Sequence, residues 1–73
     1  MARKATEQDL NGAVGRLNEF LPRPVRLAKW KRRYRVERLD GSYPFSRTWR
    51  TASELYDVLW EQIGAIVESQ RGQ

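Results

Sequence analysis

An amphipathic run near the end of the chain is the strongest structural signal in the sequence. It follows Thr51-Ala52-Ser53-Glu54, a capping-box sequence whose side chains can accept otherwise unpaired backbone N–H groups of a first helical turn. No proline interrupts the run up to about Glu68. The acidic residues at helical spacing mark a solvent side: Glu54, Asp57, Glu61 and Glu68. The pattern predicts a helix over residues 51–68, followed by a frayed tail over residues 69–73.

The apolar side of this helix is wider than one small sheet face needs. One stripe contains Leu55, Leu59 and Ile66, and the adjacent stripe contains Tyr56, Trp60, Ile63 and Val67. The second stripe, together with Trp30, is a candidate protein interface. Two interpretations stay open. Either the first helix and residues 25–27 bury this surface, or it forms a two-fold homodimer interface that would stabilise so small a domain.

A shorter helix is predicted near the start of the chain. Thr6 and Asp9 fit its first turn, where both can hydrogen-bond to the backbone. Apolar residues then recur at helical spacing: Leu10, Ala13, Val14, Leu17 and Leu21. This pattern leaves Asn18 toward solvent, and we expect Pro22 and Pro24 to end the helix.

Between the helices, the turn dipeptide Asp40-Gly41 separates two runs rich in β-branched and aromatic residues. We expect a hairpin of residues 30–38 and 43–50 in which facing positions sum to 81. Pro44, which has no N–H to donate, favours a four-residue loop over Leu39–Ser42. One face then collects the apolar residues and the opposite face the polar ones. The expected inner set is Trp30, Tyr34, Val36, Tyr43, Phe45 and Trp49, and the outer set is Lys31, Arg33, Arg35, Glu37, Pro44, Ser46, Thr48 and Arg50.

These elements predict one α+β domain over residues 1–73, with the order helix, antiparallel two-stranded hairpin, helix, and with both helices packed on one sheet face. Residues 1–5 and 69–73 are expected to fray. A domain of this length buries only about 60% of the surface of its unfolded chain. Its stability should therefore be marginal.

Positive charge is concentrated in the middle of the chain. Residues 22–50 carry ten Lys and Arg residues against Glu37 and Asp40, whereas residues 51–73 carry one Arg against four acids. The candidate contacts to nucleic acid or to an acidic partner are Lys31, Arg33, Arg35 and Arg50 on the outer hairpin face, and Arg23, Arg26 and Lys29 on its approach. Arg32, Arg38 and Arg47 lie at the expected rim. Guanidinium groups bind phosphate and guanine in bidentate fashion, and a β-ribbon can enter a major groove.

Catalysis is not expected. The sequence has no His and no Cys, so it lacks the usual general base and the usual zinc ligands, and it has no glycine-rich phosphate loop. We expect no metal, no cofactor and no small-molecule substrate. No apolar run approaches the roughly 20 residues that span a bilayer. A cytoplasmic protein is the default expectation.

The segments Leu10–Asn18 and Ser53–Leu59, separated by an aromatic hairpin, resemble small uncharacterised accessory proteins of tailed phages, especially actinobacteriophages. The chain departs from that pattern in its dense Arg content and in lacking a Gly-Gly pair in the hairpin. The resemblance implies a phage or prophage origin, the cytoplasm of a bacterial host and a host-directed role. It implies no activity.

Two functions stay open. The first is a non-enzymatic nucleic-acid-binding module that uses the basic hairpin. The second is an interaction protein or inhibitor that docks on an acidic host protein through the hairpin or through the second helix. A third interpretation of the basic face is plain solvation that keeps the hairpin soluble.

Overall fold

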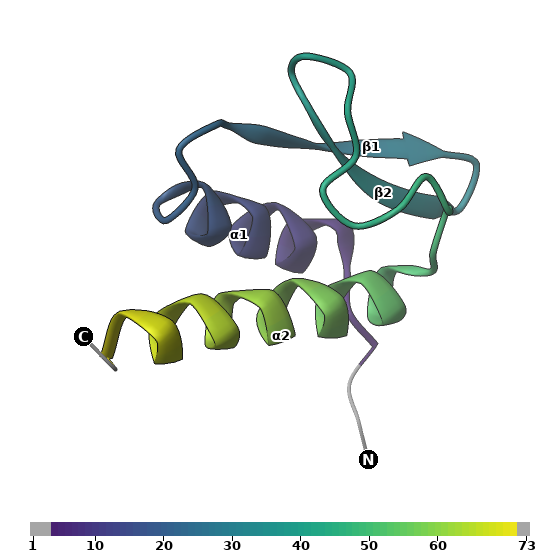
Figure 1. Cartoon of the computed structure of the whole chain (residues 1–73). Helices are drawn as coiled ribbons and strands as arrows, with labels where there is room; N and C mark the ends of the chain where they lie inside the picture. Colours follow the sequence, from purple (N-terminus) through teal and green to yellow (C-terminus); the bar gives the residue numbers. More distant parts are fainter. Residues whose placement is uncertain (1–3, 72–73) are drawn as a thin grey trace.

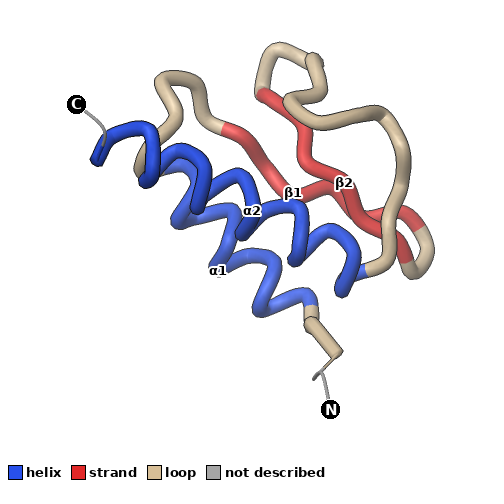
Figure 2. Tube along the Cα trace, turned by 60° about the horizontal axis from the view of Figure 1, so that its bottom comes forward, coloured by secondary structure: helices blue, strands red, loops and turns tan. Residues whose placement is uncertain are grey.

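A computed structural model describes residues 4–71 and confirms the α+β layout. The elements are α1 (Glu7–Asn18), β1 (Val25–Trp30), β2 (Arg33–Arg38) and α2 (Ala52–Arg71). The two strands form one antiparallel sheet, and both helices lie on the same side of it (Figures 1 and 2). No helix among the described residues is long and apolar enough to cross a membrane.

Helix α1 begins at the predicted capping box. The Asp9 N–H donates to Thr6 Oγ1 at 3.2 Å, and the Thr6 N–H donates to Asp9 Oδ2 at 2.9 Å. The helix ends at Asn18, three residues before the expected end, because the Phe20 and Leu21 N–H groups both turn back to the Leu17 carbonyl. This tight turn leads the chain toward the first strand.

Asn18 was expected in solvent, and that expectation is wrong. Its side chain is half-buried and bonds both backbone groups of Val25. Asn18 Nδ2 donates to the Val25 carbonyl at 3.0 Å, and the Val25 N–H donates to Asn18 Oδ1 at 2.8 Å. One amide therefore fixes the end of α1 to the start of β1.

Helix α2 also begins as predicted. The Thr51 hydroxyl accepts the Glu54 N–H at 3.3 Å and donates to the Glu54 carboxylate at 2.8 Å. The helix runs to Arg71, so residues 69–71 are helical rather than frayed. Residues 1–3 and 72–73, also expected to fray, lie outside the described residues. The Ala5 N–H donates to Ser53 Oγ at 3.3 Å, which ties the start of the chain to α2.

The core lies between the two helices and the inner side of the sheet. Its buried residues are Leu10, Ala13, Val14, Leu17, Val25, Tyr34, Val36, Leu55, Leu59 and Ile63. Ile63 is thus part of the core and cannot serve as a surface contact. Tyr56 and Val67 are half-buried against the same core, whereas Trp60 remains 43% exposed. Most of the second apolar stripe of α2 is therefore buried within the chain.

The hairpin itself is not the one that the sequence predicted. Its strands are residues 25–30 and 33–38, with Val25 facing Arg38, Leu27 facing Val36 and Trp30 facing Arg33. The turn falls at Lys31-Arg32, and Lys31 has a φ of 56°, a region that favours glycine. A turn that lacks glycine and asparagine gave no signal in the sequence. The expected pairing of residues 30–38 with residues 43–50 is wrong.

The Asp40-Gly41 turn nevertheless forms. The Gly41 N–H donates to the Arg38 carbonyl at 3.0 Å, Gly41 has a φ of 90°, and the Arg38 N–H donates to the Ser42 carbonyl at 2.8 Å. Beyond this turn the chain is irregular, since Pro44 has no N–H to give to a ladder. At the end of this segment Arg50 returns to β2, with two backbone hydrogen bonds to Tyr34 of 2.7 and 2.8 Å. Residues 39–50 are therefore a loop rather than a strand.

Candidate nucleic-acid interface

The outer side of the hairpin carries a mixture of rings and cations. Strand alternation directs Tyr34 and Val36 inward, where both are buried, so Arg33 and Arg35 face outward as expected. Trp30 lies directly across the ladder from Arg33 and shares its face. The expectation that Trp30 would pack inward is therefore wrong.

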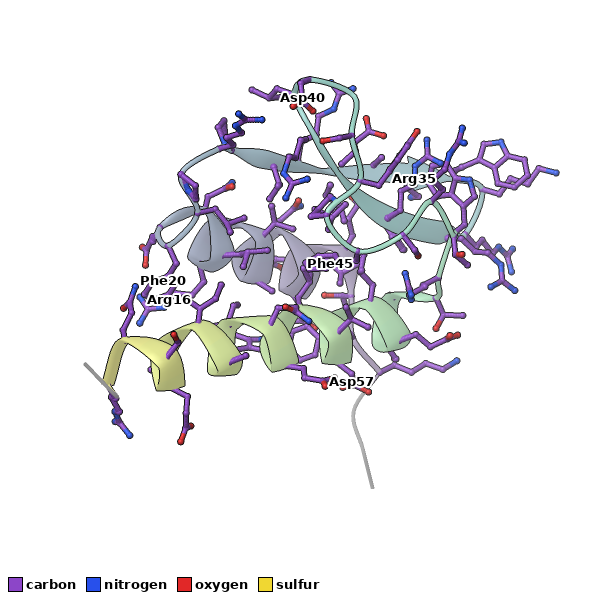
Figure 3. The ribbon with its side chains drawn as sticks, viewed as in Figure 1. Arg16, Phe20, Arg35, Asp40, Phe45 and Asp57 are labelled. Carbon is purple, nitrogen blue, oxygen red and sulfur yellow. The ribbon has the colours of Figure 1, made fainter. Side chains whose placement is uncertain are left out.

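The loop over residues 39–50 sends its rings to both sides of the sheet. Phe45 packs against the core, as predicted, and Figure 3 shows it between the loop and the helices. Tyr43 and Trp49 instead contact Arg35 on the outer side. Arg35 Cζ lies 4.6 Å from the Tyr43 ring centroid and 4.1 Å from the Trp49 centroid. Tyr43 and Trp49 were expected inside, and the irregular loop overrides the alternation on which that expectation depended.

These contacts continue into a row that we call the outer cluster. Its members in order of contact are Arg47, Tyr43, Arg35, Trp49, Trp30 and Lys31. The Trp30 and Trp49 centroids are 5.8 Å apart, and Lys31 Nζ lies 4.7 Å from the Trp30 centroid. At the other end, Arg47 Cζ lies 5.5 Å from the Tyr43 centroid. Each such cation–ring contact contributes about 0.5–2 kcal/mol, depending on its exposure.

Arg35 is held inside the outer cluster rather than presented to solvent. Its side chain is 20% exposed, its Nη1 donates to the Arg47 carbonyl at 3.3 Å, and its Nη2 lies 3.5 Å from the Glu37 carboxylate. The same carboxylate accepts hydrogen bonds from Nε and Nη2 of Arg26 at 2.9 and 2.7 Å. Glu37 therefore neutralises part of the charge of two candidate binding residues.

Three further candidates are also engaged by the chain. Arg23 lies 3.5 Å from Asp40, and Lys29 lies 3.4 Å from Glu7. Arg50 is half-buried and donates to Ser46 Oγ at 2.9 Å. The two exposed ion pairs contribute little stability, but they lower the net charge that Arg23 and Lys29 offer to a partner.

Asp40 belongs to this paired region. Hydrogen bonds from the Ser42 hydroxyl and the Ser42 N–H, with further help from Arg23 and Arg38, lower the pKa of its carboxyl group below the ordinary value of 3.8. Asp40 is thus a stable anion at neutral pH. It both shapes the turn and partners Arg23.

The turn of the hairpin is different. Lys31, Arg32 and Arg33 are exposed, and no acid of residues 4–71 lies within ion-pair distance of any of them. We call Trp30, Lys31, Arg32 and Arg33 the hairpin tip. Arg32 was assigned only to the rim of the expected face. The run Trp30-Lys31-Arg32-Arg33 would have marked the site, had the turn been placed correctly.

The acidic part of the molecule lies elsewhere. Asp57 projects from the side of α2 that faces away from the sheet, whereas Arg35 lies beside the strands (Figure 3). Glu54 and Glu61 are also exposed on α2. Residues 4–71 contain no group of three or more acidic, His or Cys side chains able to hold a metal ion. The charged groups are therefore separated into a basic tip and an acidic helix.

Comparison of the chain with protein-family models, with curated proteins and with solved structures gave no match.

Proposed function

We propose that this protein is a non-enzymatic nucleic-acid-binding module that grips the phosphate backbone with its hairpin tip. The observation that carries the proposal is that Lys31, Arg32 and Arg33 are three consecutive exposed cations without an acidic partner among the described residues. The other candidate cations have an acidic partner or a side-chain hydrogen bond within the chain: Arg23, Arg26, Lys29, Arg35 and Arg50. The full charge of the tip is therefore available to a partner.

A polyanion suits this arrangement for a physical reason. Cations that contact phosphates release the counterions condensed on the nucleic acid, and this release gives favourable free energy that depends steeply on salt. Arg32 and Arg33 add guanidinium forks that match phosphate geometry. The acids on α2 would repel a polyanion, so the charge separation also orients the approach.

The proposal also concerns where the protein acts and what the site needs for binding. A nucleic-acid partner, together with the resemblance to accessory proteins of tailed phages, favours action in the cytoplasm of a bacterial host. The site needs no cofactor, because backbone gripping requires only charge and hydrogen-bond donors.

The test is a charge-matched pair of triple variants. Lys31→Gln, Arg32→Gln and Arg33→Gln remove the charge of the tip, whereas Lys4→Gln, Arg16→Gln and Arg71→Gln remove the same charge elsewhere. Binding to fluorescent single-stranded and duplex DNA is followed by anisotropy over a salt series. Each lost phosphate contact should reduce the slope of log affinity against log salt by about 0.7 on a single strand and about 0.9 on a duplex.

The tip variant should therefore lose a slope of about 2 on a single strand if all three contacts are real. The control should keep the slope of the unmodified protein. Equal losses in both variants would mean that net charge rather than the tip drives binding. Absence of binding by the unmodified protein at about 50 mM salt would overturn the proposal, because backbone contacts are strongest at low salt.

A further inference from the structure

Trp30 is the most exposed tryptophan of the chain and lies at the hairpin tip. Its side chain is 51% exposed, compared with 43% for Trp60, and Trp49 is half-buried against Arg35 and Trp30. An exposed indole on a two-stranded hairpin contributes little to the core. Its position among three cations calls for a ligand that has both a flat apolar face and negative charge.

We propose that Trp30 is a stacking platform for an unpaired base, so that the hairpin tip prefers single-stranded nucleic acid. This inference rests on the proposed function and specifies its ligand. Bases stack on aromatic side chains without regard to sequence, because every base has a π face. Neighbouring cations then hold the backbone that links the bases.

The geometry brings the two kinds of contact together. Arg33 lies directly across the ladder from Trp30, and such facing residues are about 5 Å apart. A nucleotide whose base covers the indole therefore has its phosphate within reach of Arg33. Lys31 Nζ lies 4.7 Å from the Trp30 centroid in the free protein. When the base binds, Lys31 Nζ moves away from the ring and contacts the phosphate.

A duplex satisfies this tip less well. Its bases are already stacked on each other, so the indole meets only base edges unless a base step is unstacked at a cost in free energy. The phosphates of a duplex remain accessible to the cations. The cations therefore act on both forms, whereas Trp30 discriminates between them.

Trp60 provides a matched control. It is a second exposed indole, in edge contact with Tyr56 at a centroid distance of 6.1 Å. Its neighbours in sequence include Glu61, and Asp57 lies one helical turn before it. These acids would repel phosphate, so Trp60 is not expected to bind a nucleotide. If Trp30→Leu acted only by removing an exposed tryptophan, Trp60→Leu would cause the same loss of binding.

The experiment compares Trp30→Leu, Trp30→Phe and Trp60→Leu in the full chain at one low salt concentration. The probes are short oligothymidine, oligouridine and a DNA duplex of mixed sequence. Trp30→Leu should weaken binding of the two single strands by about 5- to 150-fold, the range that corresponds to loss of one aromatic side chain on which a base stacks. It should leave duplex binding and the salt slope unchanged. Trp30→Phe should retain most of the affinity, and Trp60→Leu all of it.

A second readout follows the ring directly. Stacking of a base on Trp30 should quench tryptophan emission on titration with oligothymidine, and Trp30→Leu should abolish that quenching. Urea unfolding of each variant verifies that the fold is intact.

Two failures are distinguishable. If Trp30→Leu leaves single-strand affinity unchanged, or weakens duplex binding equally, the stacking inference is overturned, while the tip-charge variant still reports on the proposed function. If the tip-charge variant binds like the unmodified protein, the proposed function is overturned. This inference depends on that function and is then overturned as well. Stronger binding of oligouridine than of oligothymidine, with the same Trp30 dependence, supports stacking and identifies RNA as the preferred source.

Discussion

The two ends of the hairpin carry similar numbers of cations but differ in what those cations do. At the base, Arg26 is bound to Glu37, Arg23 approaches Asp40, and Asn18 ties the strand to α1. At the tip, Lys31, Arg32 and Arg33 extend into solvent without an acidic partner among residues 4–71. The count of basic residues in a segment therefore does not locate a candidate binding site. The better candidate is the end of the hairpin where the fold leaves the charge uncompensated.

Arg35 lies between these two ends and should show the largest effect on stability. Replacement by Ala removes its contacts with the Tyr43 and Trp49 rings, its bond to the Arg47 carbonyl and its ion pair with Glu37. We expect a loss of about 2–3 kcal/mol in the free energy of unfolding, since each cation–ring contact contributes up to about 2 kcal/mol when shielded from water. The urea midpoint measures this loss.

Arg35→Met is the control, because it keeps an unbranched side chain beside the two rings. It should cost less than Arg35→Ala. If either variant instead keeps full stability and loses nucleic-acid binding, Arg35 belongs functionally to the tip, and the division between a structural and a binding end is wrong.

The second effect concerns the base of the hairpin. Asn18→Ala removes both bonds to Val25 and leaves a half-buried N–H and carbonyl without their partner, which should cost about 2 kcal/mol. Asn18→Asp keeps the acceptor for the Val25 N–H but places a carboxylate oxygen where Nδ2 donated to the Val25 carbonyl, so it should also destabilise the protein. Thermal unfolding measures both, and the salt slope for nucleic acid should stay unchanged. A reduced slope would mean that the base also contacts the ligand.

The third effect separates stability from binding at the tip itself. Lys31 has a φ of 56°, which costs a residue with a Cβ about 1–2 kcal/mol. Lys31→Gly relieves this strain but adds freedom to the unfolded chain, for a net gain of about 0.5 kcal/mol. The lost charge should reduce the single-strand salt slope by about 0.7.

Lys31→Gln is the matched variant, since it removes the charge without relieving the backbone. It should reduce the slope equally and gain no stability. Chemical denaturation and anisotropy on the same samples test the pair. Equal stability of the two variants would contradict a strained turn.

The smallest effect concerns pH. The pKa of Asp40 is lowered in the folded protein by its hydrogen bonds to Ser42, so its contribution to stability is present above pH 3.8 and is lost as the pH falls through the folded pKa. Asp40→Asn should therefore lower stability slightly at neutral pH and make little difference below the folded pKa, so that the acid side of its stability profile is flatter. A thermal melt series at acidic pH compares the two proteins. Parallel profiles would show that the carboxylate of Asp40 does not contribute.

Part of the candidate site could be predicted from sequence. The outward direction of Arg33 and Arg35 was predicted correctly, because both lie on the strand that the true and the expected hairpins share. The placement of Trp30, Tyr43 and Trp49 was not. Their positions depend on which segment pairs with β2, and the turn dipeptide at Asp40-Gly41 marked a real turn that does not close a sheet.

The two helices and their starts follow from the sequence alone, because capping and the helical period depend on residues within a few positions of each other. The sequence also indicates a middle strand on which Tyr34 and Val36 alternate with Arg33 and Arg35. The partner of that strand is seen only in the folded molecule. A strand offers two edges, and β2 pairs with residues 25–30, where Asn18 bonds Val25, rather than with residues 43–50, where Pro44 has no N–H to give to a ladder. This pairing also places some cations beside acids and leaves others without an acidic partner among residues 4–71.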